Sequence, residues 1–195
     1  TATSIRSASA ATPPRPTSRA RSRTAPGATF ADPPRVAPTL VSWAPFDLED
    51  GRNRIEILPI SKLPAHSPGD LAVWIPDARV LALGDLVWPS PNAYTGSGNV
   101  SNWLIALNAM LELQPRWVVT LRGPAADARP ARALREGFAW IRGRVEEAFV
   151  DGVPSGRIAD RVLESPQSEK FLDRDAAPSW VRGMVESVVA ETIEY

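Results

Sequence analysis

The segment HSPGDLAVWIPDARVLALGDLVW, residues 66–88, decides the fold of this 195-residue chain. Its two apolar runs, 71–75 and 80–83, flank a short turn that contains a proline and an aspartate. This arrangement predicts an antiparallel hairpin. Because each run is apolar without alternation, we expect strands buried on both faces inside a layered α/β structure.

The side chains at the ends of this hairpin are candidates for metal binding. If its turn centres between Asp77 and Ala78, residue 70 lies opposite Asp85. His66, the only histidine, lies four residues further out, in a loop rich in Pro and Gly. An imidazole and a carboxylate then share one sheet edge, where loops hold ligands on a rigid base. The alternatives are a loop histidine bonded to backbone and an Asp85 that caps its turn.

The elements before this hairpin are predicted from β-rich composition. TLVSW (39–43) and the alternating RIEILPI (54–60) suggest two strands, and the Asp50-Gly51 turn between them is typical of a hairpin.

The elements after the central hairpin are predicted mainly from apolar residues at helical spacing. A helix with Trp103 and Leu107 on its apolar stripe is expected to be capped by Asn99 or Ser101. Four elements follow in the prediction: a strand at 116–120, a helix at 130–150, a shorter helix at 156–163, and a helix after Pro178 capped by Ser179.

Residues 1–38 form an arm rich in Arg, Ser and Pro, with almost no large apolar residues. Such a segment cannot offset its ordering entropy by burial, so we expect disorder. Three explanations are open. The segment is a transit peptide, which its basic and Ser-rich composition resembles, or a tail without a special role, or the product of an out-of-frame stretch of GC-rich DNA that replaces the original N-terminus. We favour the third explanation. The folded domain is then expected at 39–195.

Composition excludes several classes of function. Lys plus Arg equals Asp plus Glu at 22 each, so we expect no nucleic-acid partner. Without cysteine there are no disulfides or thiolate zinc sites. No apolar run has the length of a membrane helix, and no Gly-x-Ser-x-Gly elbow or phosphate-binding loop occurs. We expect a soluble, cytoplasmic protein, and the Arg-, Ala- and Pro-rich composition suggests a high-GC bacterial genome.

Residues 65–88 and WVVTLRGP (117–124) resemble the second half of the metallo-β-lactamase fold hydrolases. The resemblance implies the C-terminal part of a four-layer αββα sandwich, with the other half missing. It also implies that His66 and Asp85 are zinc ligands, with Asp85 bridging two metals. In that family a metal-bound hydroxide attacks an ester, amide or thioester of a small molecule.

The chain departs from the family pattern in two places. The family's His-x-His-x-Asp-His motif does not occur, since His66 is the sole histidine. Arg122 stands where the family has a histidine ligand, and a guanidinium stays protonated and does not bind zinc. Arg122 either substitutes for the zinc charge by a salt bridge to Asp85 and His66, or is a solvated arginine. Catalytic zinc needs three protein ligands, so we expect zinc to bind weakly or not at all.

Other side chains are candidates for substrate contact, for a turn role or for an additional metal ligand. Asn92 and Tyr94, in the loop after the Asp85 strand, would face substrate by resemblance, although a plain connection is the simpler interpretation. Asp70 is expected to be a turn or cap residue. In a further alternative, Asp32, Asp47 or Asp70 completes a one-metal site with His66 and Asp85.

The sequence thus predicts a zinc hydrolase by family that is impaired in this chain, with no catalytic residue assigned. The alternative is a non-catalytic binding or structural module. A sheet without its partner half exposes apolar surface, so this alternative predicts association through that face, with homodimerisation as the simplest case.

Overall fold

The computed structural model describes residues 42, 44–49, 51–60, 64–88, 92–96, 98–173 and 178–193. The chain divides into two units, Thr1–Thr39 and Leu40–Tyr195, and the second holds every described residue. The arm at 1–38 lies outside the described residues, so its disorder and its boundary stay predictions.

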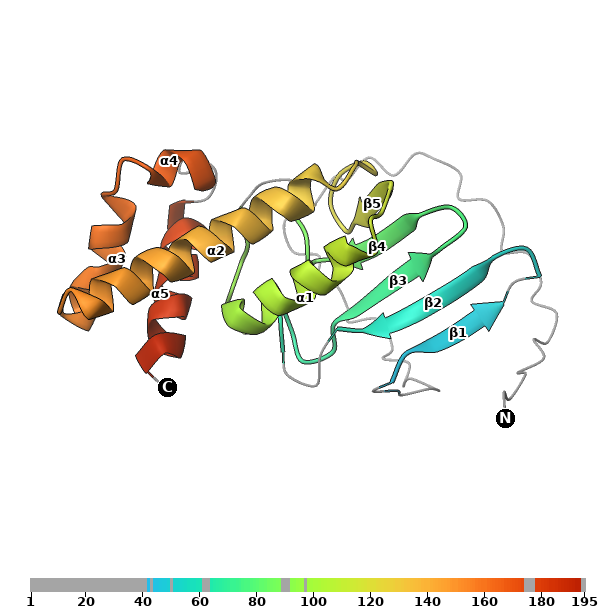
Figure 1. Ribbon diagram of the computed structural model, residues 1–195, viewed down its shortest axis with the longest axis horizontal. Helices are drawn as coiled ribbons and strands as arrows, with labels where there is room; N and C mark the ends of the chain where they lie inside the picture. The colour runs from blue at the N-terminus through green and yellow to red at the C-terminus, as the bar shows by residue number, and fades with distance from the viewer. Residues whose placement is uncertain are drawn as a thin grey trace, which may run out of the picture. The chain divides into compact units, whose positions relative to one another are not determined.

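Five strands form one mixed sheet in the order β1-β2-β3-β4-β5 (Figure 1). The first three pairs are antiparallel, and β4 and β5 are parallel. The strands are β1 (Phe46–Glu49), β2 (Arg54–Pro59), β3 (Leu71–Ile75), β4 (Val80–Gly84) and β5 (Trp117–Thr120). The helices of the described part are α1 (Val100–Glu112), α2 (Arg129–Val150), α3 (Ser155–Leu163), α4 (Ser168–Phe171) and α5 (Pro178–Ile193).

The central hairpin has the predicted register. Trp74 pairs with Leu81 and Ile75 with Val80. The pairing extends to Val73 and Ala82, and Asp70 and Asp85 both lie beyond it at the open end of the hairpin, so their facing one another stays a prediction.

The first hairpin forms around the predicted turn. A short turn containing Gly51 joins β1 to β2 and pairs Glu49 with Arg54. The first strand of this hairpin is β1 at Phe46–Glu49, a run that the sequence did not mark as a strand. The strand expected at 39–43 lies outside the described residues except for Ser42, which is not in a strand, so it stays a prediction.

The strands of the central hairpin are covered on one side. Ala72 and Trp74 on β3 and Leu81 and Leu83 on β4 are buried, whereas their neighbours in the sequence are partly or fully exposed. Helix α1 lies across the buried side (Figure 1). The prediction of burial on both sides is therefore not met by the described residues.

The other side of the sheet, called here the far face, is apolar across all five strands. Strand pairing places its residues on the same side. They are Phe46, Leu48, Ile55, Ile57, Pro59, Leu71, Val73, Ile75, Val80, Ala82, Trp117 and Val119.

On β1 and β2 the helix side is charged. Arg54 pairs with Asp47 at 3.0 Å and with Glu56 at 3.3 Å on that side. The alternation of these two strands therefore presents its apolar residues to the far face and its ion pairs to the helix side.

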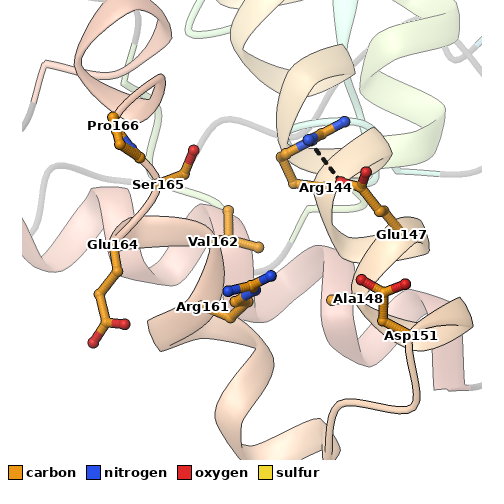
Figure 2. Close-up of a pocket in the computed structure, with 9 residues that line it drawn as sticks. All are labelled: Arg144, Glu147, Ala148, Asp151, Arg161, Val162, Glu164, Ser165 and Pro166. Atoms are coloured by element: carbon orange, nitrogen blue, oxygen red, sulfur yellow. Dashed lines mark ion pairs between the residues drawn. The ribbon is translucent and has the colours of Figure 1, made fainter.

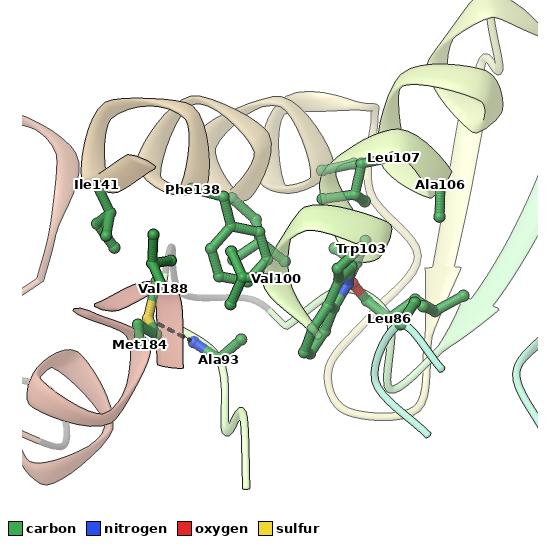
Figure 3. Close-up of a cluster of buried hydrophobic side chains, with 14 of the residues drawn as sticks. Leu86, Ala93, Val100, Trp103, Ala106, Leu107, Phe138, Ile141, Met184 and Val188 are labelled. Carbon is green, nitrogen blue, oxygen red and sulfur yellow. Dashed lines mark hydrogen bonds between the residues drawn. The ribbon is translucent and has the colours of Figure 1, made fainter. Parts of the chain in front are cut away.

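Helix α1 joins the sheet to the helical part through a core of buried side chains (Figure 3). Trp103 is fully buried and packs against Phe138 of α2 with ring centroids 5.2 Å apart. Its indole N–H donates to the Leu86 carbonyl at 2.9 Å. On the other side of this core, Met184 of α5 accepts a hydrogen bond from the Ala93 amide.

The start of α1 is held by two side chains and a close backbone contact. Asn99 is the cap, since its side chain accepts from the Asn102 amide at 2.8 Å, and Ser101 instead donates to Glu191 of α5. The Asn99 amide donates to the Ala65 carbonyl at 2.8 Å. A Cβ on Gly98 would lie 2.3 Å from that carbonyl oxygen, so only glycine fits there.

Helix α2 packs against α1 at one end and against α3 and α5 at the other (Figure 1). Helix α5 begins at Pro178, so Ser179 lies in its first turn and is not the cap that the sequence predicts. Proline is favoured in a first helical turn, which moves the start one residue earlier. None of the helices in the described part combines the length and hydrophobicity that a membrane crossing requires.

An ion pair between α3 and α5 gives a pH-dependent contribution to stability. Arg182 donates to Asp160 Oδ1 at 2.7 Å, and this hydrogen bond lowers the pKa of the Asp160 carboxyl below its ordinary value of 3.8. A lowered pKa in the folded state stabilises the fold above the ordinary value, and that stabilisation is lost as pH falls through the lowered pKa. We expect Asp160→Asn to lower the Tm at neutral pH, with the difference from wild type vanishing in acid.

Carbon-detected NMR titration checks the cause of this effect. In Arg182→Gln the Asp160 pKa should rise toward 3.8, whereas Glu164→Gln, an exposed change at the end of α3, should leave it in place. An Asp160 pKa that is the same with and without Arg182 would contradict the assignment.

Gly98→Ala tests the packing of the His66 loop on α1. The added methyl group collides with the Ala65 carbonyl, so the backbone must shift, and we expect a loss of about 1–3 kcal/mol in the free energy of unfolding. Gly69→Ala is the matched control in the loop that carries His66, because a Cβ on Gly69 would meet nothing within 4 Å. Urea unfolding measures both. Equal stability of the two variants would refute this packing argument.

Candidate functional site

The candidate site lies at the edge of the sheet where β4 and β5 end. Gly84 closes β4 with a φ of +54°, a conformation that glycine adopts freely, and Asp85 follows it. The Leu121 amide donates to the Gly84 carbonyl at 3.1 Å. Because parallel strands end at the same edge, Asp85 and Arg122 are both placed there.

Trp103 brings the His66 loop and the Asp85 turn together. The His66 ring meets the Trp103 ring edge to face, with centroids 5.3 Å apart and planes at 75°. The same indole donates to the carbonyl of Leu86, the residue after Asp85. The two predicted ligands thus belong to segments that contact one buried side chain.

Asp70 shapes the loop that carries His66. Its Oδ2 accepts from the His66 amide at 2.7 Å and from the Ser67 amide at 2.9 Å, and its Oδ1 accepts from the Ser67 hydroxyl at 2.7 Å. These bonds agree with the predicted turn role of Asp70.

The same carboxylate lies near the histidine ring. His66 Nδ1 lies 3.7 Å from Asp70 Oδ1, beyond hydrogen-bond length but on the carboxylate's side of the ring.

The donors in the described part do not fit a catalytic zinc ion. No three His, Cys, Asp or Glu side chains within the described residues lie close enough to hold a metal. Asp47 is paired with Arg54 on β1, Asp70 is engaged in its turn, and Asp32 lies outside the described residues. His66 and Asp85 remain as two candidate ligands, one fewer than a catalytic site needs.

Arg122 does not form the salt bridge that one of its two interpretations predicts. Its guanidinium lies over the Trp88 ring, with Cζ 4.7 Å from the ring centroid. No ion pair joins it to Asp85 or His66 within the part of the chain that the structure describes. The exposed cation is stacked on an aromatic face, which is a common arrangement for arginine.

Asn92 and Tyr94 differ in their surroundings. Asn92 is buried and bonded through its amide to both backbone groups of Asp173, so it ties its loop to the segment before α5. The Tyr94 ring is 54% exposed and lies 5.9 Å from the Trp180 ring. Only Tyr94 is therefore presented for contact with another molecule.

Sequence reasoning missed one participant at this edge. Trp180, in the first turn of α5, meets Trp88 edge to face with centroids 5.0 Å apart. The periodicity around Trp180 indicates only a helix, and nothing in the sequence pairs it with a residue after β4.

A surface pocket of about 370 Å³ lies between the end of α2 and α3 (Figure 2). Its charges are mixed, and Arg144 and Glu147, one turn apart on the α2 wall of the pocket, form an ion pair at 2.6 Å. None of the residues predicted from the sequence lines it. The residues that line it are Arg144, Glu147, Ala148, Asp151, Arg161, Val162, Glu164, Ser165 and Pro166.

Several solved structures are similar to this chain. The stereoselective inverting sec-alkylsulfatase Pisa1 from Pseudomonas sp. is 15% identical with a TM-score of 0.64, over 82% of this chain and 27% of that chain. A metallo-beta-lactamase from Pontibacter korlensis is 19% identical with a TM-score of 0.45, over 52% of this chain and 50% of that one. The chain thus spans half or less of the length of these structures. No curated protein matches the sequence.

A family model described as the metallo-beta-lactamase superfamily matches residues 2–120. The matched range ends with β5 and contains both His66 and Asp85. It covers more than half of the chain, and the five-stranded sheet with its helices agrees with the fold of that superfamily. The chain therefore belongs to the metallo-beta-lactamase superfamily.

Proposed function

We propose that this chain is the second half of a zinc-dependent hydrolase domain and that it retains His66 and Asp85 as residual metal ligands. The observation that carries the proposal is the shared contact of the His66 loop and the Asp85 turn with Trp103. The Asp70 carboxylate, which accepts hydrogen bonds from the backbone amides of His66 and Ser67 and so shapes the loop that carries His66, supports the same assignment.

We further propose that the chain by itself is impaired in hydrolysis. Two ligands leave a zinc ion without the third protein contact of a catalytic site, and the cation of Arg122 stands where the family has a histidine. If a metal is supplied with further ligands, the substrate class is an ester, amide or thioester of a small molecule. A cytoplasmic location and a bacterial source stay predictions.

Metal analysis tests the ligand assignment. We expect wild type to hold substoichiometric zinc after dialysis and to bind added zinc weakly, because two ligands give little chelation. His66→Ala and Asp85→Asn should each weaken that binding in calorimetric titration, and Asp47→Asn, a carboxylate change on β1, should not.

Two outcomes would contradict the proposal in different ways. Tight zinc that survives dialysis and is lost in both variants would refute impairment and indicate further ligands. Zinc binding that is the same in wild type and both variants would refute His66 and Asp85 as ligands.

A second candidate function is association through the far face of the sheet. The observation that favours it is the pattern on β1 and β2, where ion pairs occupy the helix side and apolar residues the far face. Leu48, Leu71, Trp117 and Val119 of this face are exposed and its other residues are partly buried. A soluble monomer rarely exposes a large apolar patch. We propose that a second copy of the chain covers it.

The oligomeric state tests this candidate. We expect wild type to be a dimer in light scattering after size exclusion, and Val119→Glu to be monomeric, because a buried unpaired carboxylate is costly at an interface. Ile105→Glu, at an exposed apolar position of α1 on the helix side, is the matched control and should stay dimeric. A monomeric wild type at micromolar concentration would refute self-association.

A further inference from the structure

Four side chains from separate segments meet beside the candidate site. They are called here the aromatic cluster and comprise Trp88, Tyr94, Arg122 and Trp180. Trp88 lies three residues after Asp85, and Arg122 follows β5 at the same sheet edge. Trp180 contacts both Trp88, at 5.0 Å, and Tyr94, at 5.9 Å, while Arg122 covers one face of Trp88 at 4.7 Å.

The cluster is open to solvent at its ends. Tyr94 is mostly exposed, Arg122 is exposed, and Trp88 and Trp180 are partly buried. Aromatic rings that already pack against one another, here edge to face and tilted, lose little entropy when a ligand packs on them, because their rotamers are restricted. An apolar or aromatic group of a ligand therefore has a preformed surface here.

The cluster carries one positive charge, that of Arg122. No carboxylate forms an ion pair with Arg122 within the described residues, whereas Arg182, Arg142 and Arg129 each have a close acidic partner there. Stacking on Trp88 uses the face of the guanidinium and leaves its in-plane N–H donors for an acceptor. These donors match the planar geometry of a carboxylate and the oxygens of a sulfate or phosphate.

Trp88 adds a polar feature to the same place. Its indole Nε1 is buried and has no hydrogen-bond partner among the described residues. Trp140 on α2 also has a buried indole N–H without a partner, so the Trp88 donor adds a polar group to the cluster and does not by itself identify a ligand site.

We infer that the aromatic cluster binds a small organic anion, with its apolar portion against Tyr94 and Trp180 and its anionic group on Arg122. This inference deepens the proposed function by naming a substrate class, and it depends on that function only for the claim that the ligand is hydrolysed. Binding itself needs no metal.

The experiment titrates naphthalene-2-sulfonate into the full chain in the presence of a chelator, so that zinc plays no part. Indole N–H signals in two-dimensional NMR report each tryptophan separately. The Trp88 and Trp180 signals should shift and saturate, and Trp117, on the far face, should not move. Naphthalene-2-sulfonamide, a neutral analogue of the same shape, should bind about tenfold more weakly, because it lacks the charge.

Two arginine variants separate a charge effect from a general one. Arg122→Gln should weaken sulfonate binding about tenfold and leave sulfonamide binding unchanged. Arg116→Gln is the matched control, since Arg116 also lies over a tryptophan, Trp117, at 5.9 Å, and it should bind like wild type. Tyr94→Leu, at an exposed position, should weaken both probes without affecting the fold.

Three results would overturn the inference. They are the absence of saturable shifts at Trp88 and Trp180, equal shifts at Trp117, and equal affinity for the two probes that is insensitive to Arg122→Gln. Because zinc is excluded, these failures differ from a failure of the ligand assignment, which the metal titration detects by itself.

Discussion

The burial of Trp103 is the constraint on which the rest of the described structure depends. One indole packs against Phe138, meets the His66 ring and donates its N–H to the Leu86 carbonyl. Burial of a side chain of this size contributes about 3–5 kcal/mol to stability. The sheet edge, α1 and α2 are therefore held in one arrangement by a residue that takes no part in chemistry.

The two faces of the sheet differ in where their apolar and charged residues lie. On the central hairpin, Trp74 and Leu81 face α1 and complete a core, whereas on β1 and β2 the helix side carries the ion pair of Arg54 and Asp47. Apolar residues of the outer strands are concentrated on the far face. The described helices cover the apolar residues on only one face of this sheet, and a partner is therefore proposed for the far face.

At the candidate site, the segments of His66 and Asp85 share a sheet edge with Arg122, which has no ion pair among the described residues. The proposal that His66 and Asp85 are residual metal ligands leaves the third ligand position to Arg122, whose guanidinium is stacked on Trp88. Replacing a metal ligand by a guanidinium changes which molecules the edge attracts: positive charge is provided by the chain, and its donors favour an anion. The proposed weak metal binding and the proposed anion binding both follow from this one arginine.

Local sequence was sufficient for features that are encoded within a few residues. The turn at Asp77 and Ala78 sets the register of the central hairpin, and helical periodicity places α1 and α2, because turn geometry and side-chain spacing act over short distances. The partner of Arg122, the burial of Asn92 and the contact of Trp180 with Trp88 were decided only by tertiary packing. Each joins segments far apart in the chain, and no local pattern specifies which of many polar or aromatic side chains will meet once the helices pack.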